Sequence, residues 1–307
     1  MNLQQLEYLL AVNKYRHFAR AAEHCHVTQP TLSMMIKKLE EELNVLIFDR
    51  SIQPVEPTNI GRKLIEQAQT VLSEAAGMKD LVREEQVTVS GPLKIGVIPT
   101  LAPYLIPSFL PRFLHTHPGL QLKISEHTTE DLIKQLKVRH IDIGILVTPL
   151  NDRSVREIPL FYESFLVYTS DPSEKAYIIP EEIDPNDLWL LEEGHCFRSQ
   201  VVNLCELKDQ RQVAMQYQAG SFETLKRLVE EEKGITILPE LATLHLNGRQ
   251  KKLLKPFAPP QPVREVSLVI RKNFVRQRLV EILSTAILDN LPAQIQRENP
   301  GQRVDIY

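Results

Sequence analysis

The spacing of the apolar residues changes near Ser90-Gly91-Pro92, and this change constrains the fold more than any other feature of the chain. Upstream of it, apolar residues recur every three or four positions, which is typical of amphipathic helices. Downstream, short apolar runs alternate with helical segments. The expected elements are strands over 93–98, 121–126, 141–146 and 234–239 and helices over 103–115 and 129–138. This alternation predicts an α/β domain with a parallel sheet behind a helical N-terminal segment.

A helix-turn-helix followed by a wing is predicted for the first sixty residues. Segments 3–13 and 17–24 have helical spacing, and a turn at 25–27 leads to Thr28, a suitable N-cap for the next helix. That helix carries one apolar stripe, formed by Leu32, Ile36, Leu39 and Leu43. Residues 46–58 then indicate two short strands joined by a turn, which would form the wing.

The face of this helix opposite the stripe is polar and rich in hydrogen-bond donors, as a helix in a DNA major groove needs to be. We expect groove contacts from Gln29, Pro30, Thr31, Ser33 and Lys37 and a phosphate contact from Arg50. Residues 1–62 carry seven Lys and Arg against seven Asp and Glu, and the net charge of the chain is −3. DNA binding must therefore depend on the placement of individual side chains. A solvated helix face is the alternative interpretation.

A long helical pattern extends from Thr58 to about Glu85. Its apolar stripe consists of Leu64, Ala68, Val71, Leu72 and Ala75. We expect this stripe to lie far from either core and to pair with a second copy of the chain, so the helix would be a dimerising linker.

Composition limits the class of protein. The chain has 307 residues, of which 43% are hydrophobic and 24% charged, as in a globular protein of two or three domains. No apolar run approaches the roughly 18 residues of a membrane span. Gln4, Gln5 and Glu7 interrupt any secretory signal, so we expect a cytoplasmic protein.

Three cysteines are present, Cys25, Cys196 and Cys205. In a reducing cytosol, a close pair such as Cys196 and Cys205 is more often catalytic, metal-binding, redox-sensing or without a role than a permanent disulfide. Cys25 stands between His24 and His26, but three adjacent ligands cannot wrap around one tetrahedral ion. We therefore interpret Cys25 as a packing residue, and we expect no metal and no cofactor.

Several motifs, in this order and spacing, make the whole chain resemble the LysR-type transcriptional regulators. They are Ala21-Ala22, Val27 to Ser33, Ile36 to Glu40, Leu46 to Arg50 and Thr58 to Gly61. The resemblance implies a winged helix-turn-helix, a linker helix and a periplasmic-binding-protein-like effector domain of two α/β subdomains. The implied boundaries are 1–58 for the DNA-binding domain, 59–88 for the linker, 89–163 with 265–300 for subdomain I, and 164–264 for subdomain II.

The effector half resembles the peroxide-sensing members of that family. The matching segments are Ile98 to Leu105, Leu191 to Cys196, the nine-residue step to Cys205, Ser221 to Leu225, and Gly234 to Pro239. The resemblance implies that Cys196 is the peroxidatic cysteine and Cys205 the resolving one. It also implies that the peroxide pocket is lined by Thr100, Thr129, His195 and Arg271. One position departs from the relatives: Ser199 stands where an acidic residue is common.

Helix geometry makes a disulfide between these two cysteines a conformational event. If both lie on one helix, nine residues separate their Cα atoms by about 13 Å. A disulfide needs Cα atoms roughly 4.4–6.8 Å apart. Oxidation must therefore deform the segment from 196 to 205, and this deformation is the expected switch.

The resemblance implies a cytoplasmic activator of oxidative-stress genes, not an enzyme, that works as a homotetramer on double-stranded promoter DNA with RNA polymerase. Hydrogen peroxide would be the signal, and a thiol reductant such as a glutaredoxin or thioredoxin would reset the disulfide. One alternative is a LysR-type regulator that binds a small metabolite in the cleft between the subdomains; its response would survive Cys196→Ser. The other is a two-cysteine thiol peroxidase, which has no use for residues 1–60.

Overall fold

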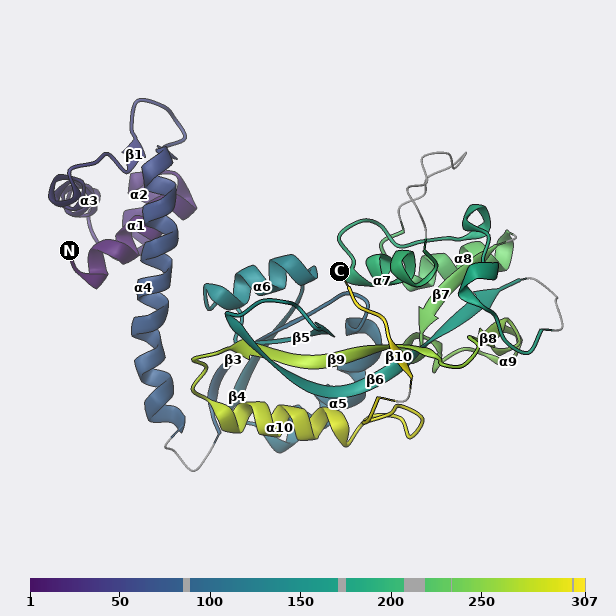
Figure 1. The fold of residues 1–307 in the computed structure, drawn as a ribbon. Helices are drawn as coiled ribbons and strands as arrows, with labels where there is room; N and C mark the ends of the chain where they lie inside the picture. The colour runs from purple at the N-terminus through teal and green to yellow at the C-terminus, as the bar shows by residue number, and fades with distance from the viewer. Residues whose placement is uncertain (85–88, 171–174, 207–218, 233, 300, 307) are drawn as a thin grey trace. The chain divides into compact units, whose positions relative to one another are not determined.

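The structure is a computed structural model and describes residues 1–84, 89–170, 175–206, 219–232, 234–299 and 301–306. The chain divides into two compact units, residues 1–85 and 86–307 (Figure 1). The first unit is helical with a small wing, and the second is an α/β domain. No helix within the described ranges is long and apolar enough to cross a membrane.

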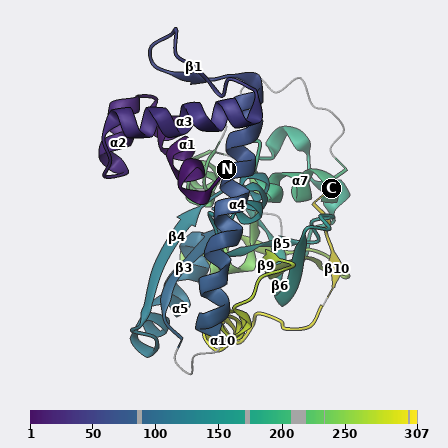
Figure 2. The ribbon, with the colours of Figure 1, turned by 90° about the vertical axis from the view of Figure 1, so that its left-hand side faces the viewer.

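The first unit is a winged helix-turn-helix followed by a long helix (Figure 2). Its elements are α1 (Leu3–Tyr15), α2 (Phe18–His24), α3 (Gln29–Leu43), β1 (Phe48–Asp49), β2 (Glu56–Pro57) and α4 (Asn59–Glu84). α3 begins where the sequence predicts, because the Thr28 hydroxyl accepts the N–H of Thr31. β1 and β2 pair antiparallel and form the wing.

The apolar stripe predicted for dimerisation is covered within the chain itself. Ala68 is buried in the core of the first unit, and Leu64, Val71 and Leu72 pack against the same core. Ala75 is half-buried. The expectation that this stripe has nothing else to bury against is therefore wrong, because the first half of α4 lies along α1. The large apolar side chains that α4 exposes are Ile60, Met78, Leu81 and Val82.

A buried carboxylate joins the wing to α3. Oε1 of Glu40 accepts the backbone N–H groups of Ile47 and Phe48 at 2.8 and 3.2 Å. Its Oε2 lies 2.7 Å from Nη2 of Arg50. The Arg50 guanidinium also lies over the ring of Phe18, 4.9 Å from its centroid. The start of the wing is therefore held at a fixed position relative to α3.

The second unit is built on one mixed sheet. Its strands are β3 (Gly91–Val97), β4 (Leu120–Glu126), β5 (Ile143–Thr148), β6 (Val155–Thr169), β7 (Ile235–Pro239), β8 (Leu254–Pro256), β9 (Pro262–Arg271) and β10 (Gln302–Arg303). Its helices are α5 (Ala102–Thr116), α6 (Thr129–Lys137), α7 (Cys196–Leu204), α8 (Phe222–Glu231), α9 (Gly248–Lys251) and α10 (Gln277–Leu288), with short 3-10 helices at Pro180–Glu182, Pro185–Asp187 and Glu240–Thr243. The strand order is β4-β3-β5-β9-β6-β7, with β10 on β9 and β8 on β6.

The prediction of a parallel sheet is correct for only part of it. β3 runs parallel to β4 and β5, whereas β9 runs antiparallel to β5 and β6, and β6 runs antiparallel to β7. A strand that is buried on both faces has the same apolar pattern in either direction, and every residue of β9 is buried. Its direction therefore depends on long-range pairing that the local pattern does not contain.

Two hydrophobic cores lie along this sheet and share strand β6. The first part of β6 pairs with β9, and its last part pairs with β7 and β8. One core gathers around β3, β5, α5, α6 and α10, and the other around β7, α7 and α8. α6 covers one face of the sheet, and α5 with α10 covers the other (Figure 1). The predicted subdomain boundaries at 164 and 265 fall inside β6 and β9.

We predict that Glu40→Ala lowers the free energy of unfolding of the first unit by about 2–3 kcal/mol, because two buried N–H groups and the Arg50 guanidinium lose their acceptor. The neighbouring Glu41→Ala is the control, since Glu41 is exposed, and it should change stability by less than about 0.5 kcal/mol. Urea unfolding followed by circular dichroism measures both. Equal unfolding midpoints for the two variants would contradict the role of Glu40.

Candidate redox site and DNA-binding surface

Cys196 and Cys205 lie at opposite ends of one short helix. Cys196 is the first residue of α7, and Cys205 is the residue that caps its C-terminal end. Both are free thiols. α7 contains nine residues, so its ends are about 13 Å apart at the usual rise per residue. Both cysteines do lie on one helix, so their sulfur atoms can bond only if α7 unwinds.

The turn before α7 explains the Gly-His-Cys motif. Gly194 has φ +94°, in the left-handed region that favours glycine. This turn makes His195 the N-cap residue and delivers Cys196 to the N-terminus of the helix. His195 is buried, and its Nε2 lies 3.6 Å from Oε1 of Glu192. The thiol therefore lies where backbone N–H groups without helical partners point toward it.

The surroundings of Cys196 act on its thiol in opposite directions. Burial raises the pKa of Cys196 above the ordinary value. The charge of Arg264, the hydroxyl of Thr129 and the backbone N–H groups of Phe197 and Cys196 lower it, in that order, without reversing the increase. The thiol form therefore dominates at neutral pH, and the groups that stabilise a thiolate are already in position.

The hydroxyl of Thr129 lies near the thiol of Cys196. Thr129 is buried as the first residue of α6, and its hydroxyl lowers the pKa of Cys196. Its Oγ1 makes no hydrogen bond among the residues that the structure describes. A buried hydroxyl without a partner is costly, which is a reason to expect a second function for it. Of the pocket residues that the resemblance implies, the structure thus places Thr129 and His195 beside Cys196.

Arg264 supplies the positive charge of this site. It is completely buried, its Nη1 donates to Oγ1 of Thr100 at 3.2 Å, and its Nη2 donates to the Thr100 carbonyl at 3.4 Å. Its Nε donates to Oε1 of Glu163 at 2.8 Å, and its guanidinium lies 5.2 Å from the ring centroid of Phe197. Thr100 therefore reaches the site through Arg264, which the sequence analysis missed.

Arg271, predicted to line the pocket, lies elsewhere. Its Nη1 donates to the carbonyl of Leu136 near the end of α6, and its guanidinium lies over Phe274. Arg264 and Arg271 are seven residues apart on β9, so they point to opposite faces of the strand. The strand Pro262 to Arg271 contains both arginines among apolar residues, and the sequence pattern alone did not indicate which one faces the thiol.

The position of Ser199, where relatives often have an acidic residue, does not face the buried thiol of Cys196. It lies in α7 with its side chain exposed.

Cys205 is half-buried. Its burial, and to a smaller extent the negative charge of Glu181, raises its pKa to about 12. At neutral pH Cys205 is therefore a protonated thiol and a poor nucleophile while α7 remains folded.

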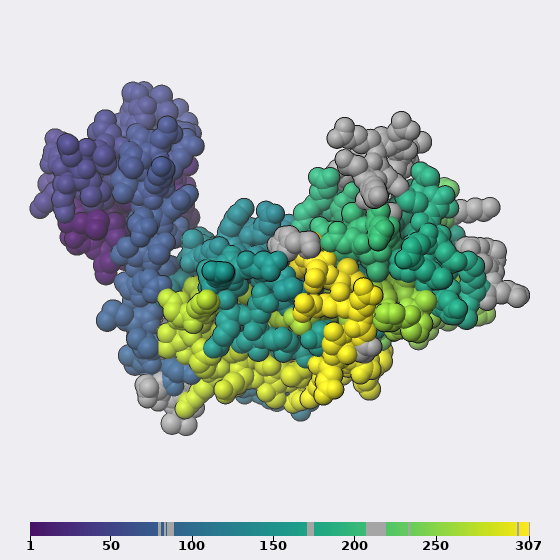
Figure 3. All heavy atoms as spheres, viewed as in Figure 1, coloured from purple at the N-terminus to yellow at the C-terminus, as the bar shows by residue number. Residues whose placement is uncertain are grey.

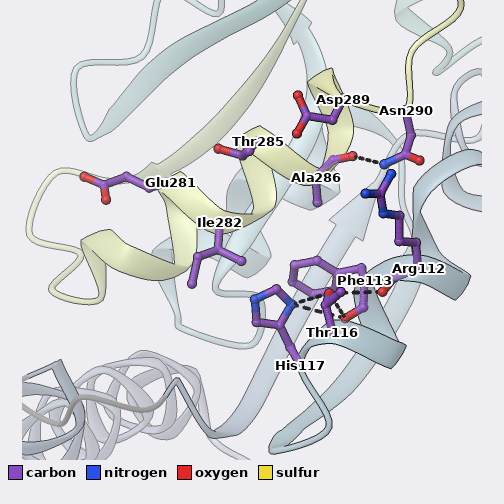
Figure 4. A pocket seen from close by; sticks show the side chains of 10 residues that line it. All are labelled: Arg112, Phe113, Thr116, His117, Glu281, Ile282, Thr285, Ala286, Asp289 and Asn290. Carbon is purple, nitrogen blue, oxygen red and sulfur yellow. Dashed lines mark hydrogen bonds between the residues drawn. The ribbon is translucent and has the colours of Figure 1, made fainter.

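A separate hollow of about 460 Å³ lies between α5 and α10 (Figure 4). Its lining includes Arg112, His117, Glu281 and Asp289, with both signs of charge. Several of its polar groups are occupied by helix-end hydrogen bonds, such as Asn290 Nδ2 to the Ala286 carbonyl at 2.8 Å. None of the lining residues belongs to the group around Cys196. Among the described residues, no cluster of His, Cys, Asp or Glu is placed to hold a metal ion.

The predicted DNA-contacting residues are accessible to solvent on the first unit. Gln29, Pro30, Thr31 and Lys37 are exposed, and Ser33 is half-buried. Nη1 of Arg50 lies 3.5 Å from Oγ of Ser33, so the arginine at the wing and the polar face of α3 form one continuous surface. Lys37 forms an exposed pair with Glu41 at 3.7 Å, which contributes little and does not bury the lysine.

Comparisons with known proteins agree with this division of the chain. Residues 3–62 match the family of bacterial regulatory helix-turn-helix proteins of the lysR family, and residues 87–292 match the LysR substrate binding domain. The hydrogen peroxide-inducible genes activator of Haemophilus influenzae is 34% identical over 95% of this chain and 97% of its own length.

Two solved structures are similar in fold. Full-length OxyR from Pseudomonas aeruginosa, a cysteine-to-aspartate variant, is 35% identical and has a TM-score of 0.75, covering 96% of this chain and 100% of its own. A hydrogen-peroxide-bound cysteine-to-serine variant of OxyR from Corynebacterium glutamicum is 28% identical, with a TM-score of 0.61 over 94% of this chain and 92% of its own.

We predict that Thr129→Val slows oxidation of Cys196 by hydrogen peroxide about tenfold, because loss of the hydroxyl raises the pKa of the thiol and removes a donor that stabilises the thiolate. The rate of sulfenic acid formation, measured by stopped-flow with a trapping reagent in a Cys205→Ser background, provides the test. Thr129→Ser keeps the hydroxyl and should retain most of the rate. If valine and serine behave alike, the hydroxyl has no part in the reaction.

Proposed function

The chain belongs to the LysR family of bacterial transcriptional regulators, and from that premise we propose that it senses hydrogen peroxide through a reversible disulfide between Cys196 and Cys205. The observation that carries the proposal is the position of Cys196: a buried thiol at a helix N-terminus with Arg264 and Thr129 beside it. Because Cys196 is buried, a small uncharged oxidant such as hydrogen peroxide suits this thiol better than a bulky reagent.

The proposed reaction proceeds in two balanced steps. The Cys196 thiolate attacks one oxygen of hydrogen peroxide, the O–O bond breaks, and the leaving hydroxide takes up a proton as water, so the sulfur becomes a sulfenic acid. The Cys205 sulfur then attacks the Cys196 sulfur, the S–O bond breaks, and a second water leaves. Arg264 stabilises the thiolate in the first step, and Thr129 can donate a hydrogen bond to the thiolate or to the leaving oxygen.

Local charges and burial determine which cysteine reacts first. Both thiols have raised pKa values, but only Cys196 has an arginine and a hydroxyl that favour its thiolate. Cys205 has a raised pKa of about 12 and a neighbouring carboxylate, Glu181, which disfavours ionisation further. Cys196 is therefore the peroxidatic residue in this proposal, and Cys205 resolves the sulfenic acid after α7 opens.

The same proposal assigns the remaining parts of the chain. Residues 1–58 bind double-stranded promoter DNA, the exposed apolar residues at the end of α4 join two copies, and two dimers form a homotetramer that acts with RNA polymerase as an activator in the cytoplasm. A dithiol reductant of the glutaredoxin or thioredoxin type resets the disulfide. The relatives are regulators rather than enzymes, which argues against the alternative of a thiol peroxidase.

Mass spectrometry after a brief micromolar peroxide pulse tests the switch. We predict a Cys196–Cys205 link in the wild type, with Cys25 free; no link and no transcriptional response in Cys196→Ser; and in Cys205→Ser a reaction that stops at sulfenic acid or a mixed disulfide. Cys25 in the dominant disulfide, or Cys205 oxidised while Cys196 stays a thiol, would overturn peroxide sensing and leave a metabolite-responsive regulator as the alternative.

We predict separate effects for base-contacting and phosphate-contacting residues. Gln29→Ala and Thr31→Ala should relax sequence preference, whereas Arg50→Ala should weaken binding to all duplexes alike and lower the salt slope by about one. Fluorescence anisotropy over a salt series, with promoter and scrambled duplexes, measures both effects. Circular dichroism controls for the loss of the Arg50 pair with Glu40. Unchanged binding in all three folded variants would exclude this docking surface.

A further inference from the structure

A short segment at residues 301–306, the strap, ties the redox helix to the sheet. Its strand β10 runs parallel to β9, and the N–H of Val304 donates to the carbonyl of Val263 at 2.9 Å. On the other side of the strap, Nε2 of Gln200, in the middle of α7, donates a hydrogen bond to the carbonyl of Val304 at 2.6 Å. Val304 thus bridges α7 and β9, and it meets β9 at Val263, the residue before Arg264 in the chain. The strap passes α7 in both ribbon views (Figures 1 and 2).

Further contacts hold the strap at the same place. Nδ2 of Asn203, also in α7, donates to the Asp305 carbonyl at 3.3 Å. Arg303 lies 3.6 Å from the buried carboxylate of Glu265. Val304 and Ile306 are buried, each in a different one of the two cores. On the surface, the end of the chain lies against residues of both halves of the unit (Figure 3).

Gly301 and Gln200 are suited to the close approach of the strap to β9 and α7. A Cβ at Gly301 would lie 2.1 Å from the backbone oxygen of Gln261, so only glycine lets the strap approach β9 this closely. Gln200 is completely buried, and its Oε1 has no hydrogen-bond partner among the described residues. A buried amide is costly, and the bond to Val304 is what offsets this cost. The burial of the Gln200 amide is therefore compensated by a hydrogen bond only while the strap is in place.

We propose that the strap is a lock that keeps α7 helical and so controls the step in which Cys205 reaches the oxidised Cys196. The inference rests on the proposed peroxide-sensing function. In that step the Cys205 sulfur attacks the sulfur of the Cys196 sulfenic acid, the S–O bond breaks, and the hydroxide leaves as water with the Cys205 proton. The attack requires α7 to unwind, and unwinding separates Gln200 and Asn203 from the strap.

The strap therefore stabilises the reduced form and opposes disulfide formation. A weaker strap makes opening of α7 easier, so the disulfide forms at a lower oxidant level and is harder to reduce. Opening also exposes Cys205 to solvent and removes the burial that raises its pKa. Gln200 and Asn203 act here as positioning residues, since neither touches the sulfur that peroxide attacks.

A redox titration against the two forms of dithiothreitol tests the lock in the full-length chain. Gly301→Ala displaces the strap, and Asn203→Ala with Arg303→Ala removes contacts made by partly exposed side chains. Each is expected to raise the equilibrium constant for the Cys196–Cys205 disulfide about tenfold, which makes its midpoint potential about 30 mV more negative. Gln302→Ala, at an exposed strap position, is the matched control and should leave the midpoint unchanged.

Alkylation of Cys205 in a Cys196→Ser background provides a second measurement that needs no disulfide. The two strap variants should react about tenfold faster than the parent and the Gln302→Ala control. Unchanged midpoints together with unchanged alkylation would overturn the lock. If the wild type forms no Cys196–Cys205 disulfide while the strap variants still alkylate faster, the proposed peroxide switch fails but the hold of the strap on α7 stands.

Discussion

The ion pair between Glu163 and Arg264 is the interaction on which the rest of the effector unit depends. The two residues face each other across β6 and β9, and both side chains are completely buried. Two charges taken out of water cost several kcal/mol each unless every hydrogen bond is made. Here Oε2 of Glu163 accepts the N–H of Leu241, and Arg264 uses its remaining donors on Thr100. The pair therefore fixes the strand register where the two cores meet.

The same pair determines what chemistry is possible beside it. Carboxylate and guanidinium neutralise each other, so Arg264 stabilises a thiolate less than an isolated arginine would, and the burial of Cys196 keeps the net shift of its pKa upward. A resting thiol of this kind resists accidental alkylation and oxidation. Reactivity then depends on Arg264, a hydroxyl and backbone N–H groups together, which stabilise charge as it develops during attack on peroxide.

Local features of the fold could be predicted from the sequence, and long-range ones could not. Thr28, the α3 stripe and the Gly-His-Cys turn depend on residues close in the chain, so their signals are complete within a short window. The direction of β9 and the choice between Arg264 and Arg271 depend on strands paired across more than 100 residues. The α4 stripe shows a third cause: apolar spacing shows that a face is buried but not what covers it, and here α1 covers its first half.

The reversibility of the proposed switch follows from the folding cost of α7. A structural disulfide joins residues that already lie close, so its formation costs little and it resists reduction. The Cys196–Cys205 bond forms only after a nine-residue helix is lost and the contacts of that helix with β9 and the 301–306 segment are separated. That cost is subtracted from the stability of the disulfide and raises its reduction potential, so a cellular dithiol can break the bond. Peroxide reduction is favourable enough to drive the change, and refolding of the helix drives the return.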